Sequence, residues 1–211
     1  MNALPALICI PDISGFTQFM SQIDFELSSK VIPSLLNNII YSNEIGLKVS
    51  EIEGDAVLFY RTGELPDLKD LIEQCKLFYT EFYKQISLLQ RSNAHMRDSA
   101  KIPDILGLKI ILHFGKQIGV VPIGKRFKLM GEDVIVAHRL LKNNIPFDEY
   151  ILISSDLLSQ YSNTTKDEIF EWGNLKRSQM DVEHMGAKEF YYINLLPLVD
   201  DEDKNLEYTN N

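Results

Sequence analysis

Two short acidic segments carry the side chains best suited to chemistry in this chain. Asp12 follows the apolar run Ala6 to Ile10, and Asp55 lies in a turn between two apolar runs, residues 46–52 and 56–60. A strand that ends in Asp, beside a hairpin whose turn carries Asp, can bring two carboxylates together at one edge of a sheet. Such hard oxygen ligands suit Mg²⁺ or Mn²⁺, which bind through one or two carboxylates and the phosphates of a substrate. The two segments therefore indicate phosphate chemistry.

Each aspartate also has an ordinary structural interpretation. Asp12 would be the N-cap of a helix, and Asp55 would favour the turn in which it lies. Either residue alone favours that interpretation. Their occurrence together, in the motifs described below, favours metal binding instead.

The hydrophobic pattern around these residues predicts an α+β protein. Apolar residues at helical spacing mark a long helix at 67–91, and Pro33 is expected to break or kink the helix before it. The polar residues 92–105 indicate a surface connection. The order of strand, two helices, hairpin, helix and strand is typical of a ferredoxin-like fold, with an antiparallel sheet and helices packed on one face. The expected strands are residues 5–11, a hairpin over 46–60, 106–114, 119–123, 126–130, 150–153 and one or two more ending near 195, and the expected helices are 14–23, 25–45, 67–91, 132–143 and 155–161.

Five blocks resemble the class III nucleotide cyclases, the adenylyl and guanylyl cyclase superfamily, in the order of that family. DISGFT at 12–17 is similar to its Asp-Ile-x-Gly-Phe-Thr opening, and IEGDA at 52–56 to its Ile-Gly-Asp hairpin. LKIILHFG at 108–115 resembles its Val-Gly-Ile-His-x-Gly strand. GEDVIVAHRL at 131–140 resembles Gly-Asp-x-Val-Asn-x-Ala-x-Arg-Leu, and 151–155 the strand and Ser that follow. The chain thus resembles a divergent, bacterial-type, single-domain member of the superfamily over nearly its whole length.

The resemblance implies the same fold and a two-metal site for a nucleoside triphosphate. Asp12 and Asp55 would hold two Mg²⁺ or Mn²⁺ ions, one favouring the 3′-oxyanion nucleophile and the other bridging the phosphates. Arg139 would stabilise charge that develops on the α-phosphate.

Further residues are expected to hold the triphosphate. The backbone amides of Ile13, Gly15, Phe16 and Thr17 would cradle it at a helix N-terminus, where Gly15 permits close approach. The family holds the terminal phosphates with a late Lys, and the nearest match here is Lys188.

One motif position departs from the family pattern in a way that bears on activity. Four residues before Arg139, where the family carries the Asn that orients the ribose, this chain has Ile135. Loss of that hydrogen bond would lower the rate by orders of magnitude without abolishing chemistry. His138 could donate in its place, although a partly exposed helix histidine is the favoured interpretation. His113, inside an apolar strand, is expected to be a satisfied core histidine.

Glu51 and Lys128 stand at the base-recognition positions implied by the resemblance. Glu51 matches guanylyl cyclases, whereas Lys128 matches neither adenylyl nor guanylyl cyclases. Together they could pair with guanine, with adenine or with uracil, so hydrogen bonding leaves the base open. An alternative is a Glu51–Lys128 ion pair between neighbouring strands, which would close the base pocket.

Composition limits the classes of function. The 211 residues suit one domain, assigned to residues 1–197, followed by an acidic tail at 198–211 that we expect to be disordered. The formal net charge of −9 argues against nucleic acid and anionic membranes as partners. No apolar stretch has the length of a membrane span, and the two cysteines, Cys9 and Cys75, form no disulfide framework. A cytoplasmic protein is therefore expected.

The resemblance also implies that a complete site forms only at a homodimer interface. One chain would contribute Asp12, Glu51 and Asp55, and the other would contribute Lys128 and Arg139.

Three functional hypotheses follow. The first is an active cyclase that converts a nucleoside triphosphate to a 3′,5′-cyclic nucleotide and pyrophosphate. The second, motivated by Ile135 and Lys128, is a catalytically degenerate homologue that binds a nucleotide or only dimerises. The third is a different phosphotransferase on a ferredoxin-like core.

Overall fold

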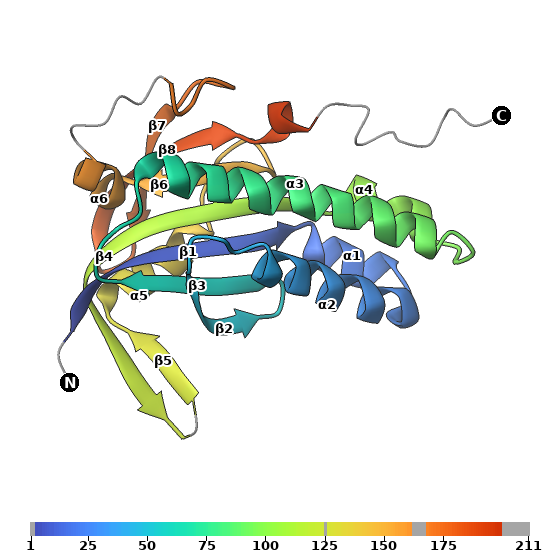
Figure 1. Ribbon diagram of the computed structural model, residues 1–211, viewed down its shortest axis with the longest axis horizontal. Helices are drawn as coiled ribbons and strands as arrows, with labels where there is room; N and C mark the ends of the chain where they lie inside the picture. The colour runs from blue at the N-terminus through green and yellow to red at the C-terminus, as the bar shows by residue number, and fades with distance from the viewer. Residues whose placement is uncertain (1–2, 125, 162–167, 200–211) are drawn as a thin grey trace.

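The computed structural model describes residues 3–124, 126–161 and 168–199 of the chain (Figure 1). The strands are β1 (Leu4–Ser14), β2 (Lys48–Glu53), β3 (Ala56–Thr62), β4 (Gly107–Ile123), β5 (Arg126–Met130), β6 (Tyr150–Ser154), β7 (Lys176–Val182) and β8 (Gly186–Asn194). The α-helices are α1 (Phe16–Gln22), α2 (Phe25–Tyr41), α3 (Leu68–Ser92), α4 (Ile102–Ile105), α5 (Glu132–Leu140) and α6 (Ser155–Leu158). Single 3₁₀ turns are η1 (Ser99–Lys101), η2 (Ser159–Tyr161) and η3 (Leu196–Leu198).

The described strands form one mixed sheet in the order β2-β3-β1-β4-β6-β8-β7, and β5 pairs with the far part of β4. β1 lies between β3 and β4 and is antiparallel to both. β4 and β6 pair in parallel, and the remaining neighbours are antiparallel. The arm, formed by residues 119–123 of β4 and all of β5, projects from the body of the molecule in Figure 1.

Helices cover both faces of the sheet. Along β1, Leu7 and Cys9 point into a large core shared with α2 and α3, which pack against each other. Ala6 and Ile8 point into a smaller core shared with α5. Because successive side chains of a strand alternate between faces, α5 lies on the face opposite α2 and α3. The continuous apolar run of β1 is typical of a strand that is buried on both sides.

The predicted α+β class is confirmed, and two details of the prediction are corrected. The sheet is not wholly antiparallel, because the chain crosses through α5 between β4 and β6 and returns in the same direction. The helices are not confined to one face, because α5 carries its own apolar stripe, which includes Val136, Ala137 and Leu140, onto the second face.

The boundary between β1 and α1 differs from the prediction in a way that matters for the site. Pairing with β4 continues as far as Ser14, so Asp12 is a strand residue and not a helix N-cap. Gly15 is the N-cap, with φ 77°, and an added Cβ there would lie 1.9 Å from the carbonyl oxygen of Ile105. Only glycine fits this turn, because a side chain would meet both backbone strain and a clash.

Three other boundaries differ from expectation. Pro33 lies inside α2 without ending it, and the helix stops at Tyr41. The expected connection at 92–105 contains η1 and α4, because Ile102 is fully buried and draws the segment onto the core. β4 runs unbroken into the arm as one long strand.

Two predictions concern features beyond the sheet. Among the described helices, none has both the length and the apolar character that a bilayer crossing requires. The predicted tail falls outside the described residues, apart from residues 198 and 199.

Candidate functional site

A cavity of about 560 Å³ opens where β1 ends and α1 begins. Both predicted metal ligands line it, and so does the whole DISGFT segment. The lining residues are Asp12, Ile13, Ser14, Gly15, Phe16, Thr17, Gln18, Glu53, Asp55, Ala56, Lys109, His138, Leu141 and Lys142.

Strand register brings the two aspartates together. Asp12 lies opposite Ala56 on β3, and Asp55 immediately precedes that partner in the hairpin turn. The amide of Ile13 donates to the carbonyl oxygen of Asp55 at 2.9 Å, which fixes the turn against the end of β1. The register therefore places both aspartates at one cavity, and their predicted role as metal ligands stays a prediction.

Burial makes both carboxylates difficult to ionise. The pKa of Asp12 is raised to about 6, chiefly by desolvation, while Lys109 lowers it and the neighbouring charge of Asp55 raises it. The pKa of Asp55 is also raised, again chiefly by burial. Two carboxylates that lack sufficient positive charge around them are a suitable site for a cation.

Lys109 is a member of this site that the sequence analysis did not identify. It lies opposite Asp12 in the β1–β4 register, and its Nζ is 3.2 Å from Asp12 Oδ1. Lys142, at the end of α5, is exposed and lines the same cavity. The sequence did contain a signal for this residue, because a lysine inside an otherwise apolar strand needs a partner for its charge. An unpaired charge is costly in such a position.

The amides predicted to cradle a triphosphate are only partly available. The Ile13 amide is already bonded to Asp55, and the Ile13 side chain is buried, so its predicted contact is corrected. Gly15 was expected to let a phosphate approach the backbone closely. In the structure its Cα instead lies against the backbone carbonyl of Ile105. Phe16 and Thr17 are the first residues of α1, and the N-cap provides no side-chain hydrogen bond for their amides.

Arg139 and Lys188 do not line this cavity. Arg139 lies on an exposed face of α5, one turn after Ile135, which is 48% exposed. Lys188 is on β8, which is separated from β1 by β4 and β6. Neither residue is therefore brought to the two aspartates within one chain.

Glu51 and Lys128 meet within a single chain, where their charged atoms are 2.8 Å apart. Of the two alternatives left open by the sequence, the ion pair is the one that the structure contains. The pairing lies within one chain because β2 and β5 are in contact, and the predicted division of these residues between two protomers stays a prediction. The Lys128 side chain is half exposed, so the pair contributes little to stability.

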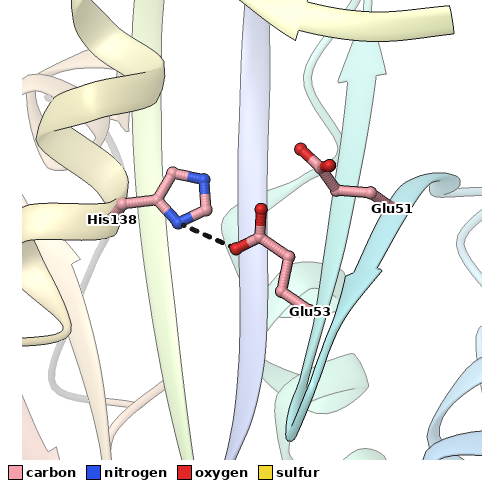
Figure 2. A group of neighbouring side chains, drawn as sticks. All are labelled: Glu51, Glu53 and His138. Carbon is pink, nitrogen blue, oxygen red and sulfur yellow. Dashed lines mark ion pairs between the residues drawn. The ribbon is translucent and has the colours of Figure 1, made fainter.

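A third group joins β2 to α5, and two of its members, Glu53 and His138, line the cavity. Glu53 Oε2 is 3.4 Å from His138 Nδ1, and Glu51 lies close to both (Figure 2). The sequence analysis favoured an ordinary role for His138 and gave none to Glu53.

Other motif residues form a buried network away from the cavity. His113 Nδ1 lies 2.9 Å from Ser154 Oγ, and its Nε2 lies 3.6 Å from Asp133 Oδ1. Asp133 also accepts from the backbone amides of Lys116 and Gln117. His113 is thus a core histidine, as predicted, but it is only partly satisfied, because Nε2 has no partner within hydrogen-bond distance. The network anchors α5 to β4.

Comparison with known proteins gives a family match and a related chain. A family described as "Protein of unknown function (DUF2652)" matches residues 32–150. An uncharacterized protein of Mycobacterium tuberculosis is 26% identical over 126 residues, which are 60% of this chain and 58% of that protein. The matched region therefore spans less than two thirds of the relative's length.

Solved structures of nucleotidyl cyclases have the same fold. The catalytic core of a rhodopsin-guanylyl cyclase with converted specificity, in complex with ATPαS, has a TM-score of 0.63 and 17% identity, and the match covers 92% of this chain and 97% of that one. The adenylyl cyclase CyaB of P. aeruginosa has a TM-score of 0.61 and 17% identity, with coverage of 90% and 94%. At this identity the likeness shows the fold, which is that of class III cyclase catalytic domains.

Proposed function

The chain belongs to the DUF2652 family of proteins of unknown function, and for it we propose the activity of a class III nucleotidyl cyclase. It would convert a nucleoside triphosphate to a 3′,5′-cyclic nucleotide and pyrophosphate at a homodimer interface. The observation that carries this proposal is the Asp12–Asp55 pair in a cavity at the end of β1, on a cyclase fold. A cytoplasmic location would suit such a substrate.

The donor set fits two Mg²⁺ or Mn²⁺ ions. Asp12 and Asp55 offer oxygen ligands only, and burial raises the pKa of both although the charge of Lys109 opposes the shift. When bound, the ions would supply charge stabilisation for the attacking and leaving oxygens. The two carboxylates would hold the ions in place.

The lysines of the cavity would bind the phosphates. Lys109 pairs with Asp12, and its ammonium group could turn to a phosphate oxygen once cations neutralise the aspartates. Lys142 is exposed at the cavity mouth, where it could hold the terminal phosphates. Either contact would orient the chain of phosphates for attack by the ribose 3′-oxygen.

A second copy of the chain would complete the site. Arg139 is exposed and does not line the cavity of its own chain, so it would reach the α-phosphate from the partner. Exposed apolar side chains occur on β2, on the arm and on α5, and such patches are typical of interaction surfaces. These residues are Val49, Ile52, Ile123, Phe127, Met130 and Ile135.

A catalytically degenerate cyclase homologue is the second candidate. Ile135 is exposed on the same face of α5 as Arg139 and cannot orient a ribose by hydrogen bonding. The Lys109–Asp12 ion pair would also compete with metal binding. Such a protein would bind a nucleotide without turnover.

The test is incubation of the full chain with ATP, GTP, CTP and UTP separately, first with Mn²⁺ and then with Mg²⁺. Products are identified by mass spectrometry, with Asp55→Ala as the control. A cyclic nucleotide that is absent from the control establishes the cyclase and its base. Nucleotide binding without any product establishes the degenerate alternative, and absence of both refutes the proposal.

A further inference from the structure

Three side chains with metal-ligand chemistry, other than the aspartate pair, converge from two elements at the side of the cavity, and Glu53 and His138 among them line it. Glu51 and Glu53 are two residues apart on β2 and therefore share one face of the strand, and His138 reaches toward them from α5. One donor atom from each lies within 4.8 Å of the other two. Figure 2 shows the imidazole and both carboxylates pointing toward a common space.

The spacing of two of these donors already suits a metal ion. Glu53 Oε2 and His138 Nδ1 are 3.4 Å apart. Two ligands that bind one ion tetrahedrally, each at about 2.0–2.1 Å, stand about 3.4 Å from each other. Only the flexible side chain of Glu51 must turn to bring a third donor into range.

The donor types select a class of metal. Imidazole nitrogen combined with carboxylate oxygen suits Zn²⁺ and similar transition ions, whereas Mg²⁺ prefers oxygen ligands alone. The side chains of Glu53 and His138 are 45% and 30% exposed, so an ion can enter from solvent and keep a water ligand. The set thus differs in chemistry from the all-carboxylate pair formed by Asp12 and Asp55.

We propose that Glu51, Glu53 and His138 bind one divalent transition-metal ion, with Zn²⁺ as the best match. The Ile-Gly-Asp motif that this hairpin resembles has an apolar residue before Gly54, where this chain has Glu53, so the resemblance does not account for the acid. The site does not depend on the proposed cyclase activity.

Binding at this site competes with the Glu51–Lys128 ion pair. Glu51 cannot direct the same oxygen lone pairs to a metal ion and to the ammonium group 2.8 Å away. Because Lys128 is half exposed, solvent compensates it when the pair opens. Removal of the lysine charge should therefore strengthen metal binding, while removal of a ligand should weaken it.

The test is a titration of the full chain with Co²⁺, a spectroscopic substitute for Zn²⁺, in excess Mg²⁺ to occupy the carboxylate pair. We expect visible absorption from one bound Co²⁺ that Zn²⁺ displaces. Glu53→Gln and His138→Gln should each weaken binding about ten-fold or more, since even partners of metal ligands contribute that much. Lys128→Met should strengthen it several-fold.

Two control variants separate this site from others. His184→Asn removes the histidine of an exposed His184–Glu183 pair, 3.5 Å apart, and should leave Co²⁺ affinity unchanged. Asp55→Ala should also leave it unchanged, even if it abolishes cyclase activity. Absence of a Co²⁺ signal, loss of the signal only in Asp55→Ala, or equal affinity in wild type and His138→Gln would overturn the proposal. Unchanged affinity in Lys128→Met would remove Glu51 from the ligand set.

Discussion

Asp12 and Asp133 both lie in segments that resemble one protein family, yet the fold places their carboxylates in opposite conditions. Burial raises the pKa of Asp12 to about 6, and the charge of Asp55 adds to the effect. The pKa of Asp133 is lowered, chiefly by the nearby imidazole of His113 and also by hydrogen bonds from two backbone amides. The fold thus makes the negative charge of Asp12 unfavourable, whereas it stabilises the negative charge of Asp133.

The contrast distinguishes residues that build the site from residues that act in it. Asp133, at the first turn of α5, uses its hydrogen bonds to fix the helix on β4. A satisfied carboxylate gains little from a further cation. Asp12 pairs with a single lysine and lines a cavity, so a cation would relieve the cost of its burial. Four substitutions test this division, and we take them in order of expected effect.

Replacement of Asp55 should have the largest consequence. Asp55→Ala removes half of the proposed metal-binding pair, and the several kcal/mol that such ions contribute correspond to a rate at least about a thousand-fold lower. Cyclic nucleotide formation with Mn²⁺ measures the effect. Asp181→Ala, an exposed carboxylate on β7 at the other edge of the sheet, is the control. Equal loss in both variants would contradict a specific role for Asp55.

Asp12 should lower the free energy of unfolding as pH rises, whereas Asp133, with its lowered pKa, should have the opposite effect. A carboxyl whose pKa rises from 3.8 to about 6 on folding stabilises the fold while it is protonated. That contribution is complete below pH 4 and is lost as pH rises through about 6, by roughly 3 kcal/mol. Asp12→Asn, which stays neutral, should therefore be the more stable protein at pH 7.

Urea unfolding of metal-free wild type and Asp12→Asn between pH 4 and pH 7 measures this effect. The advantage of the variant should disappear below pH 4, where wild-type Asp12 is protonated. Mn²⁺ affinity of the wild type should rise through pH 6, because only the ionised carboxylate binds the ion. A variant that is less stable than wild type at pH 7 would refute the account of Asp12 as an unfavourable buried charge.

Asp133→Ala should be the most destabilising change in the buried network. It removes the acceptor for the amides of Lys116 and Gln117, and it leaves His113 without its carboxylate partner, at a cost of about 2 kcal/mol. Glu132→Ala is a matched control, because this exposed acid shares the first turn of α5 and its helix-dipole effect. Similar losses in both variants would assign the effect to the dipole alone.

Local pattern predicted much of the fold. The long amphipathic helix was expected at 67–91 and is found at Leu68–Ser92, because an apolar stripe of that length leaves no alternative. The hairpin that carries Asp55 was also predicted, since its turn residues separate two apolar runs. Both predictions depend only on residues that are close together in the sequence.

The rest depended on contacts between distant segments. Lys109 reaches Asp12 through the register of β1 and β4, which periodicity alone does not define. The placement of α5 on the second face follows from the parallel pairing of β4 and β6. The group formed by Glu51, Glu53 and His138 requires that placement, so no local motif could have identified it.

Ile135→Asn should have the smallest effect on stability and a gain in activity. Ile135 is 48% exposed, so the change should alter the free energy of unfolding by no more than about 0.5 kcal/mol. An amide at this position, one turn before Arg139, would restore the family's ribose-orienting group and should raise turnover about ten-fold or more. Leu88→Asn, at a 51% exposed position on α3, is the matched control. A gain in Ile135→Asn alone would show that the aspartate pair is competent and that orientation limits the rate, whereas unchanged turnover would mean that another residue already orients the ribose.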